Sequence, residues 1–194
     1  RNLAEDPAHA ETLSRMRAAL RERMIAVGDL GLIPEIELNR YETRYLAIAS
    51  VGPSTRAALF DRATAEPADP PAEPAADDSM RFWDAMHGLY SGSDAWIAAA
   101  RNDPSPAIAL PALGLALRKG LEPDAAAQAL AEALEDSDEW VRLAAVTAID
   151  DAGEAARPLI PHLAKALDDP VNKYVVRVAT HALNVLEGTE RIAP

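Results

Sequence analysis

The protein has 194 residues, a net charge of −12 at neutral pH and no cysteine. The lack of cysteine excludes disulfides, thiolate nucleophiles and cysteine-ligated zinc, and no apolar run reaches the roughly 18 residues of a membrane span. Hydrophobic residues make up 49% of the chain but aromatic residues only 5%. Because much of the apolar content is alanine, which favours helix and has little bulk, the composition predicts closely packed helices.

The negative charge is concentrated after residue 65. Residues 1–65 carry nine basic and nine acidic side chains, whereas residues 66–194 carry ten basic and 22 acidic side chains. Such an excess of carboxylates repels phosphate backbones, so we expect no nucleic-acid partner.

The first expected helix begins at Asp6-Pro7, because Asp caps free N–H groups and Pro suits a first turn. Apolar residues then step by three or four along one face of the helix until Gly28 ends it: Leu13, Met16, Leu20, Met24 and Val27. Pro34 opens a second expected helix, with Tyr41, Tyr45 and Ile48 on one face. A third expected helix ends near Ala63.

Residues 65–79 are expected to form an extended, mobile connector. Four prolines lie there among alanines and acidic residues: Pro67, Pro70, Pro71 and Pro74. Proline lacks a backbone donor and blocks helix, and like charges repel. We therefore predict three parts, residues 1–64, 65–79 and 80–194.

The third part has the pattern of tandem helical hairpins. Asp103, Asp136 and Asp169 lie in turns that are 33 residues apart, and a fixed period of a few tens of residues indicates a solenoid. Helices are expected over residues 95–101, 107–119, 123–135, 138–152, 154–167 and 171–187. An earlier helix, capped by Asp78-Ser79, is expected to turn Trp83, Met86 and Tyr90 inward. The predicted fold class is all-α, with hairpin repeats after a small helical segment.

These hairpins resemble HEAT-type repeats. Val141, Ala145 and Ala148 match Ile108, Ala112 and Leu115 at a shift of 33 residues, and small residues let stacked helices cross closely. The resemblance implies a ladder between repeats, in which a turn Asp meets an Arg at the start of a helix. The candidate residues are Asp136, Asp138, Arg142, Asp168, Asp169 and Arg177. Arg142 is assigned to Asp136 or Asp138, and Arg177 to Asp168 or Asp169. The first unit has Ala109 where the Arg would be.

The N-terminal part resembles the C-terminal end of a formylglycine-dependent sulfatase. The phrases Asn2–Pro7 and Gly28–Glu35, separated by one helix, carry the resemblance over about the first 50 residues. It implies a non-catalytic region of a sulfate ester hydrolase, which in some bacterial members continues into a helical-repeat tail. Pro53-Ser54-Thr55-Arg56 does not fit the Cys/Ser-x-Pro/Ala-x-Arg motif, so no catalytic position carries over. The catalytic centre, its calcium and export to the periplasm or medium would belong to the whole enzyme.

No motif in these residues carries chemistry of its own. The four histidines, His9, His87, His162 and His181, lack the spacing of a ligand pair, and the acidic doublets lack the pattern of a calcium loop. We therefore predict no catalytic, cofactor-binding or metal-binding residue. Trp140, beside an acidic turn, is either a packing anchor or a partner contact, since Trp dominates interface energetics.

Three functions remain open on the sequence. In the first, the chain belongs to a sulfatase-type hydrolase, and its repeats bind a partner, a substrate-bearing surface or the enzyme's own catalytic domain. In the second, the chain is a freestanding HEAT-like scaffold that binds a basic protein. In the third, the repeats only stabilise an enzyme.

Overall fold

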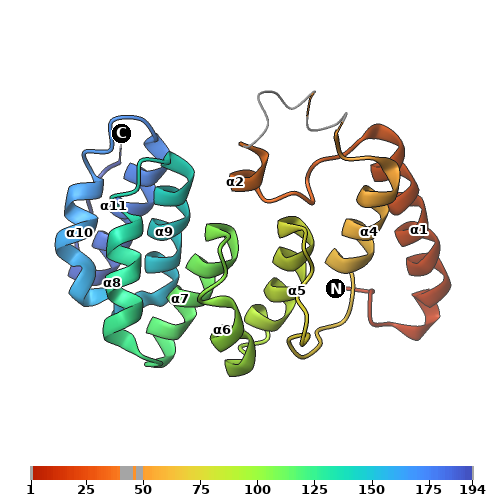
Figure 1. The fold of residues 1–194 in the computed structure, drawn as a ribbon, viewed down its shortest axis with the longest axis horizontal. Coiled ribbons are helices and arrows are strands. Elements are labelled where there is room, and N and C mark those ends of the chain that lie inside the picture. Colours follow the sequence, from red (N-terminus) through yellow and green to blue (C-terminus); the bar gives the residue numbers. More distant parts are fainter. Residues whose placement is uncertain (1, 40–45, 47–49, 194) are drawn as a thin grey trace. The chain divides into compact units, whose positions relative to one another are not determined.

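The computed structural model describes residues 2–39, 46 and 50–193. Every regular element in this part of the chain is a helix (Figure 1), which confirms the all-α prediction. None of the described helices is long and apolar enough to cross a membrane. The chain divides into two units, of which the first ends at Ala65 and the second begins at Glu66. The three predicted parts of the chain stay a prediction.

Unit 1 contains four described elements: η1 (Pro7–His9), α1 (Ala10–Val27), α2 (Glu35–Leu38) and α4 (Pro53–Ala63). Asp6 begins the first element by accepting a hydrogen bond from the Ala8 N–H at 3.0 Å, and Gly28, with φ of 69°, ends α1. α1 packs against α4. Arg21 of α1 donates to both carboxylate oxygens of Asp61 on α4, at 2.7 and 2.8 Å.

The predicted apolar stripe of α1 is largely exposed. No residue of α1 is buried, and Met16, Leu20 and Val27 are 63%, 54% and 47% exposed. α4, which packs against α1, has 11 residues against the 18 of α1. α2 begins after Pro34 as predicted, while Tyr41, Tyr45 and Ile48 lie outside the described residues.

Unit 2 is a stack of helical pairs. Its elements are α5 (Asp78–Tyr90), α6 (Asp94–Ala100), α7 (Pro106–Lys119), α8 (Pro123–Ala133), α9 (Glu139–Ala152), η2 (Gly153–Leu159), α10 (Ile160–Ala166) and α11 (Lys173–Glu187). α5, α7, α9 and α11 each contact the next of these four along the stack, and α6, α8 and α10 contact the helices that follow them. This order of contacts is that of a helical-hairpin solenoid (Figure 1).

Local capping chemistry sets the helix starts in unit 2. The side chains of Asp77, Ser93, Asp138 and Asn172 each accept a hydrogen bond from a backbone N–H in the first turn of the following helix. α5 is therefore capped by Asp77, one residue before the predicted Asp78-Ser79. Asp138 caps α9 as predicted. These bonds satisfy N–H groups that a helix start otherwise leaves without a partner.

The predicted helix over residues 154–167 has two parts. Residues Gly153–Leu159 form a 3-10 helix, and an α-helix follows from Ile160. Pro158 and Pro161 lie on either side of this change. Because proline has no N–H to donate, Pro158 and Pro161 each withhold one backbone hydrogen bond near this change, which favours the short 3-10 segment before the α-helix.

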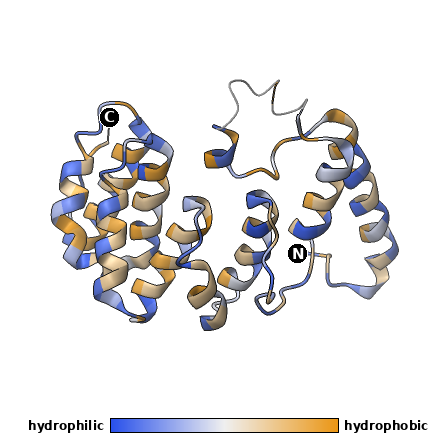
Figure 2. Cartoon of the chain, viewed as in Figure 1, coloured by the Kyte–Doolittle hydropathy of each residue, from blue (hydrophilic) through white to orange (hydrophobic). Residues whose placement is uncertain are grey.

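The core of unit 2 lies where α7 and α9 cross. Ala112, Ala145 and Ile149 are fully buried, and each helix of the unit carries both hydrophobic and hydrophilic residues (Figure 2). A Cβ atom added to Gly114 of α7 would lie 2.6 Å from the Ala148 carbonyl oxygen of α9. Glycine at this position therefore allows the two backbones to approach closely.

The structure differs from two predictions about the start of unit 2. Met86 of α5 is buried as expected, but Tyr90, in the last position of that helix, is 88% exposed. The predicted connector carries no helix between residues 66 and 77. It nonetheless contacts the first helical pair, since the Trp96 indole N–H donates to the Ala68 carbonyl oxygen at 2.5 Å.

Candidate functional site

Arg142 and Asp169 form the most enclosed ion pair of unit 2. Arg142 lies in the first turn of α9, and Asp169 lies in the turn before α11. The guanidinium Nε and Nη2 donate to the two carboxylate oxygens at 2.6 and 3.2 Å. The side chains are only 12% and 3% exposed. The third guanidinium nitrogen donates to the carbonyl oxygens of Asp136 and Ser137 at 2.8 and 3.1 Å, so Arg142 joins its own turn to the next one.

Asp169 also organises its own turn. Its Oδ1 accepts hydrogen bonds from the N–H groups of Val171 and Asn172, at 3.0 and 2.7 Å. The hydrogen bond from Arg142, aided by these two N–H groups, lowers the pKa of Asp169 from 3.8 to about 2 despite its burial. The same pair raises the pKa of Arg142. Both groups are therefore charged throughout the physiological pH range.

Arg81 and Asp103 repeat this arrangement at the beginning of the stack. Arg81 of α5 donates to both Asp103 carboxylate oxygens at 3.0 and 3.1 Å. It also donates to the carbonyl oxygens of Ala75 and Ala76 at 3.2 and 3.1 Å. Asp103 Oδ1 accepts from the Ser105 N–H at 2.8 Å, as Asp169 does in its turn. The hydrogen bond to Asp103, together with a second one to Asp78 at 2.7 Å, raises the pKa of Arg81 despite its partial burial.

Our sequence analysis missed Arg81, although a local signal was present. Arg81 follows its helix-capping Asp77 by four residues, and Arg142 follows its helix-capping Asp138 by four residues. In both cases the arginine reaches back to the two carbonyl groups that precede the cap. A capping Asp followed by Arg four residues later therefore identifies this ladder position in the chain.

The step between the Asp103 turn and the Asp136 turn has its aspartate but not its arginine. Asp136 Oδ1 accepts from the Asp138 N–H at 2.8 Å, and Asp138 Oδ1 accepts from the Trp140 N–H at 2.8 Å. Ala109, four residues after the capping position Ser105, occupies the place of the arginine. The ladder thus has one step that ends at the Asp103 turn and one that begins at the Asp136 turn, and it lacks the step between these two turns.

The structure pairs the predicted ladder residues differently from the sequence-based assignment. Arg142 meets the carboxylate of Asp169, in the next turn, and reaches Asp136 only through its carbonyl oxygen. Arg177 lies with its guanidinium carbon 5.6 Å from the centre of the Tyr174 ring. Asp168 is exposed in the turn beside Asp169. The pairing runs between repeats, as the resemblance implies.

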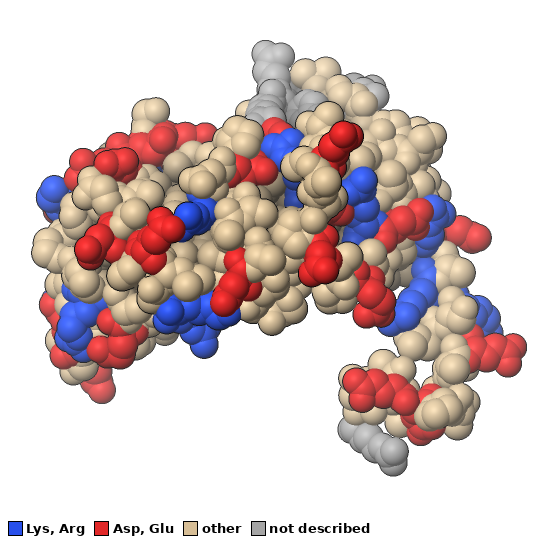
Figure 3. Space-filling view, turned by 60° about the horizontal axis from the view of Figure 1, so that its bottom comes forward, with Lys and Arg blue, Asp and Glu red and all other residues tan. Residues whose placement is uncertain are grey.

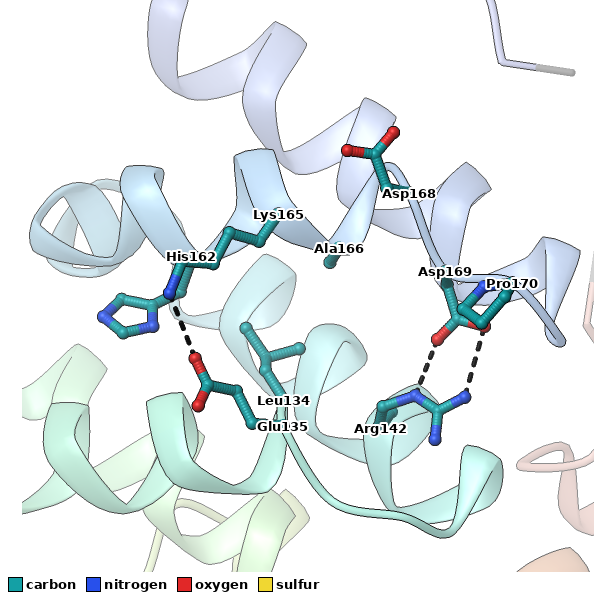
Figure 4. Close-up of a pocket in the computed structure, with 9 residues that line it drawn as sticks. All are labelled: Leu134, Glu135, Arg142, His162, Lys165, Ala166, Asp168, Asp169 and Pro170. Carbon is teal, nitrogen blue, oxygen red and sulfur yellow. Dashed lines mark hydrogen bonds and ion pairs between the residues drawn. The ribbon is translucent and has the colours of Figure 1, made fainter.

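A pocket of about 170 Å³ lies beside the Arg142–Asp169 pair (Figure 4). It is lined by Leu134, Glu135, Arg142, His162, Lys165, Ala166, Asp168, Asp169 and Pro170. Both of its cations already face carboxylates, since Lys165 lies 3.2 Å from Glu135. The lining offers no hydroxyl or thiol nucleophile. The pocket thus lies between the two turns that Arg142 joins.

The histidines do not gather into a metal site. His181 Nδ1 lies 2.8 Å from an oxygen of Asp150, and the His87 ring lies 6.4 Å from that of Trp83. His162 lines the pocket, with a buried Nδ1 that has no hydrogen-bond partner. No group of three potential metal ligands occurs within the described residues.

The stacked helical pairs define a helical-repeat protein of the all-α class. Residues 93–184 match the family model of HEAT repeats, so this part of the chain is a HEAT-like repeat region. No curated protein and no solved structure matches the chain. HEAT repeats form helical scaffolds that commonly mediate protein interactions.

Proposed function

We propose that unit 2 is a non-catalytic scaffold that docks a basic segment of a partner protein. The observation that carries this proposal is the imbalance of charge after residue 65, with 22 acidic and ten basic side chains. Many of the ten cations already hold carboxylates of the same unit, as in the ladder and in the pair of Lys119 with Asp94 at 2.5 Å. Acidic side chains are spread over the face in Figure 3, with basic ones among them.

The best-placed carboxylates form an acidic turn surface, defined by Asp136, Asp138, Glu139 and Asp168. Asp136, Asp138 and Asp168 are exposed, and Glu139 is half-buried. The carboxylates of Asp136 and Asp138 each accept a hydrogen bond from a backbone N–H. The ladder brings the two turns together, because Arg142 bonds both of them.

Trp140 supports the choice of this surface. It is half-buried in the first turn of α9, directly after the acidic residues. A half-buried Trp provides apolar contact area and an indole that a cation can approach. Carboxylates around such a ring attract Lys and Arg, so the surface suits a basic segment with an apolar side chain.

The test measures binding of a fluorescent peptide of alternating Lys and Ala to the whole chain. We expect binding that weakens as NaCl rises from about 50 to 300 mM, because salt screens exposed charges. A variant with Asp136→Asn, Asp138→Asn, Glu139→Gln and Asp168→Asn keeps its hydrogen-bond acceptors and should lose at least about tenfold in affinity, or about 1.4 kcal/mol.

A second variant provides the control for net charge. Asp124→Asn, Glu132→Gln, Glu66→Gln and Glu190→Gln remove the same charge at exposed positions outside this surface. We expect the affinity of this variant for the peptide to fall by less than about threefold, since exposed distant charges are screened. Equal losses in the two variants would show diffuse attraction and contradict a defined docking surface.

A second candidate function is that of a non-catalytic part of a sulfatase-type hydrolase. The phrases Asn2–Pro7 and Gly28–Glu35 support it, and so do the exposed apolar side chains of α1, which suit packing against a larger body. In this proposal unit 1 braces the catalytic domain of a sulfate ester hydrolase, and catalysis and calcium belong to that domain. The present chain should then hydrolyse no aryl sulfate, and the gene product should contain a formylglycine motif. A gene product without that motif would end this proposal.

A further inference from the structure

The proline-rich segment of residues 67–74 lies in a groove of the first helical pair. Pro70, Pro71 and Pro74 line one small pocket together with Trp96 of α6 and other residues of α5, α6 and α7. The Trp96 indole N–H donates to the Ala68 carbonyl oxygen at 2.5 Å. The segment that the sequence marks as a connector is thus held to the first helical pair through the Ala68 carbonyl group and the half-buried Pro70, whereas Pro67, Pro71 and Pro74 are exposed.

The groove holds Trp96 in a fixed position. A Cβ atom added to Gly88 of α5 would lie 1.7 Å from Cδ1 of Trp96, so the indole ring packs directly on the α5 backbone. The backbone N–H of Trp96 is held by the capping Ser93 at 3.3 Å. Trp96 is 7% exposed, and Ala100 and Ile108, which also line the pocket, are buried. The apolar floor and the indole donor are therefore positioned by α5, α6 and α7.

A second donor holds the other end of the segment. Arg81 donates to the carbonyl oxygens of Ala75 and Ala76, and Asp103 orients its guanidinium from the opposite side. Both donors thus bond backbone carbonyl groups. Prolines leave a backbone with acceptors and few donors, so a groove with an indole N–H, a guanidinium and an apolar floor is complementary to such a chain.

The bound segment also has the spacing of a polyproline ligand. Pro67 and Pro70 are three residues apart, and so are Pro71 and Pro74. Proline fixes its own φ and holds the preceding residue extended, and a polyproline II helix repeats every three residues. Docking such a segment costs little conformational entropy, which is why aromatic grooves in unrelated proteins recognise it.

From these contacts we infer that the groove is a binding site for proline-rich segments, which the chain fills with its own residues 67–74. An external segment with Pro-x-x-Pro spacing binds in the same place when the internal one leaves. The inference is independent of the proposed scaffold role, because the acidic turn surface and the groove share no residue.

The test uses the whole chain and a synthetic peptide with the sequence of residues 65–76. In one variant, Pro67→Ser, Pro70→Ser, Pro71→Ser and Pro74→Ser release the internal segment. The readout is the nuclear magnetic resonance signal of the Trp96 indole N–H, assigned with Trp96→Phe. We expect a saturable shift with a Kd below about 1 mM in the four-serine variant. The unaltered chain should bind at least about tenfold more weakly, because its tethered segment competes at a millimolar effective concentration.

Two controls define the contacts. Trp96→Phe in the four-serine background keeps an aromatic ring but removes the donor, so the affinity should fall by about five- to tenfold, the usual worth of one hydrogen bond. For this variant, binding is followed by the fluorescence of a labelled peptide. Gly88→Ala in the same background should displace the indole and abolish the shift. A peptide in which serine replaces the four prolines should not bind.

Three results would overturn the inference. The first is a folded four-serine variant, with unchanged helical circular dichroism, that does not bind the peptide. The second is equal binding of the proline-free peptide. The third is loss of the folded state in the four-serine variant, because the segment would then be a fixed part of the core and not a replaceable ligand.

Discussion

Arg142 of α9 and Asp169 of the following turn are 27 residues apart and form a bidentate ion pair that joins two neighbouring repeats. The pair is nearly buried, and each partner also bonds the backbone of a turn. It therefore ties the geometry of one repeat to that of the next. Buried charges of this kind are costly when one partner is removed, which leads to the first prediction.

Arg142→Ala should destabilise unit 2 by about 2 kcal/mol or more, because it leaves the Asp169 carboxylate buried without its cation. Chemical unfolding followed by circular dichroism measures the change. Arg157→Ala is the matched control, since Arg157 pairs with Glu154 on the surface, where the side chains are 53% and 71% exposed. That control should change stability by less than about 0.5 kcal/mol. Similar losses in the two variants would refute the structural role of the ladder.

The stability of the protein should depend on the ionisation of Asp169 at acid pH. Its pKa is about 2 in the folded chain and 3.8 without its partners. A carboxylate whose pKa is lower in the folded chain stabilises the fold when the pH is above the pKa of the unfolded chain. This contribution disappears as pH falls from about 4 towards 2. The stability difference between the unaltered chain and Asp169→Asn should shrink by about 1 to 2 kcal/mol over that range. Urea unfolding at pH 7, 4 and 2.5 measures it, and a constant difference would contradict the assignment.

Ala109→Arg should add the missing step of the ladder. Ala109 and Asp136 are 27 residues apart, as are Arg142 and Asp169, and Asp136 already forms the same kind of turn. We expect a gain of about 0.5 to 1 kcal/mol, the usual range for a partly exposed ion pair. The gain should vanish in the presence of Asp136→Asn, as a double-mutant cycle would show. A gain that persists without the carboxylate would contradict the missing ladder step, because arginine is no better a helix former than the alanine it replaces.

Gly114→Ala should destabilise unit 2 even though alanine is the better helix former. The added Cβ would lie 2.6 Å from the Ala148 carbonyl oxygen, so α7 and α9 must separate. Overpacking of this kind costs about 1 to 3 kcal/mol. Gly52→Ala, where the added Cβ has no atom within 4 Å, should cost less than about 1 kcal/mol. Thermal unfolding compares the two, and a stabilised Gly114→Ala would disprove the close crossing.

The helices of unit 2 were predictable because their limits depend on nearby residues. Asp138 before α9 and Gly188 after α11 act within one or two turns of the backbone, so their effect can be deduced from the sequence. Tyr90 was predicted wrongly because periodicity alone places it on the inner face of α5, whereas in the structure it lies at the last helical position, 88% exposed beside the buried Leu89. The split of the helix over residues 154–167 depends on two prolines that the apolar pattern does not show.

The sequence by itself determined that the chain is helical, where most helices of unit 2 begin and end, and that aspartates recur every 33 residues. Capping, proline geometry and apolar spacing act between close neighbours, and this is why the sequence sufficed. Only the tertiary structure decided that Asp169 receives Arg142, that Arg81 belongs to the same ladder, and that the proline-rich segment lies against Trp96. Those contacts join residues 22 to 28 positions apart, and they depend on how the stacked helices pack.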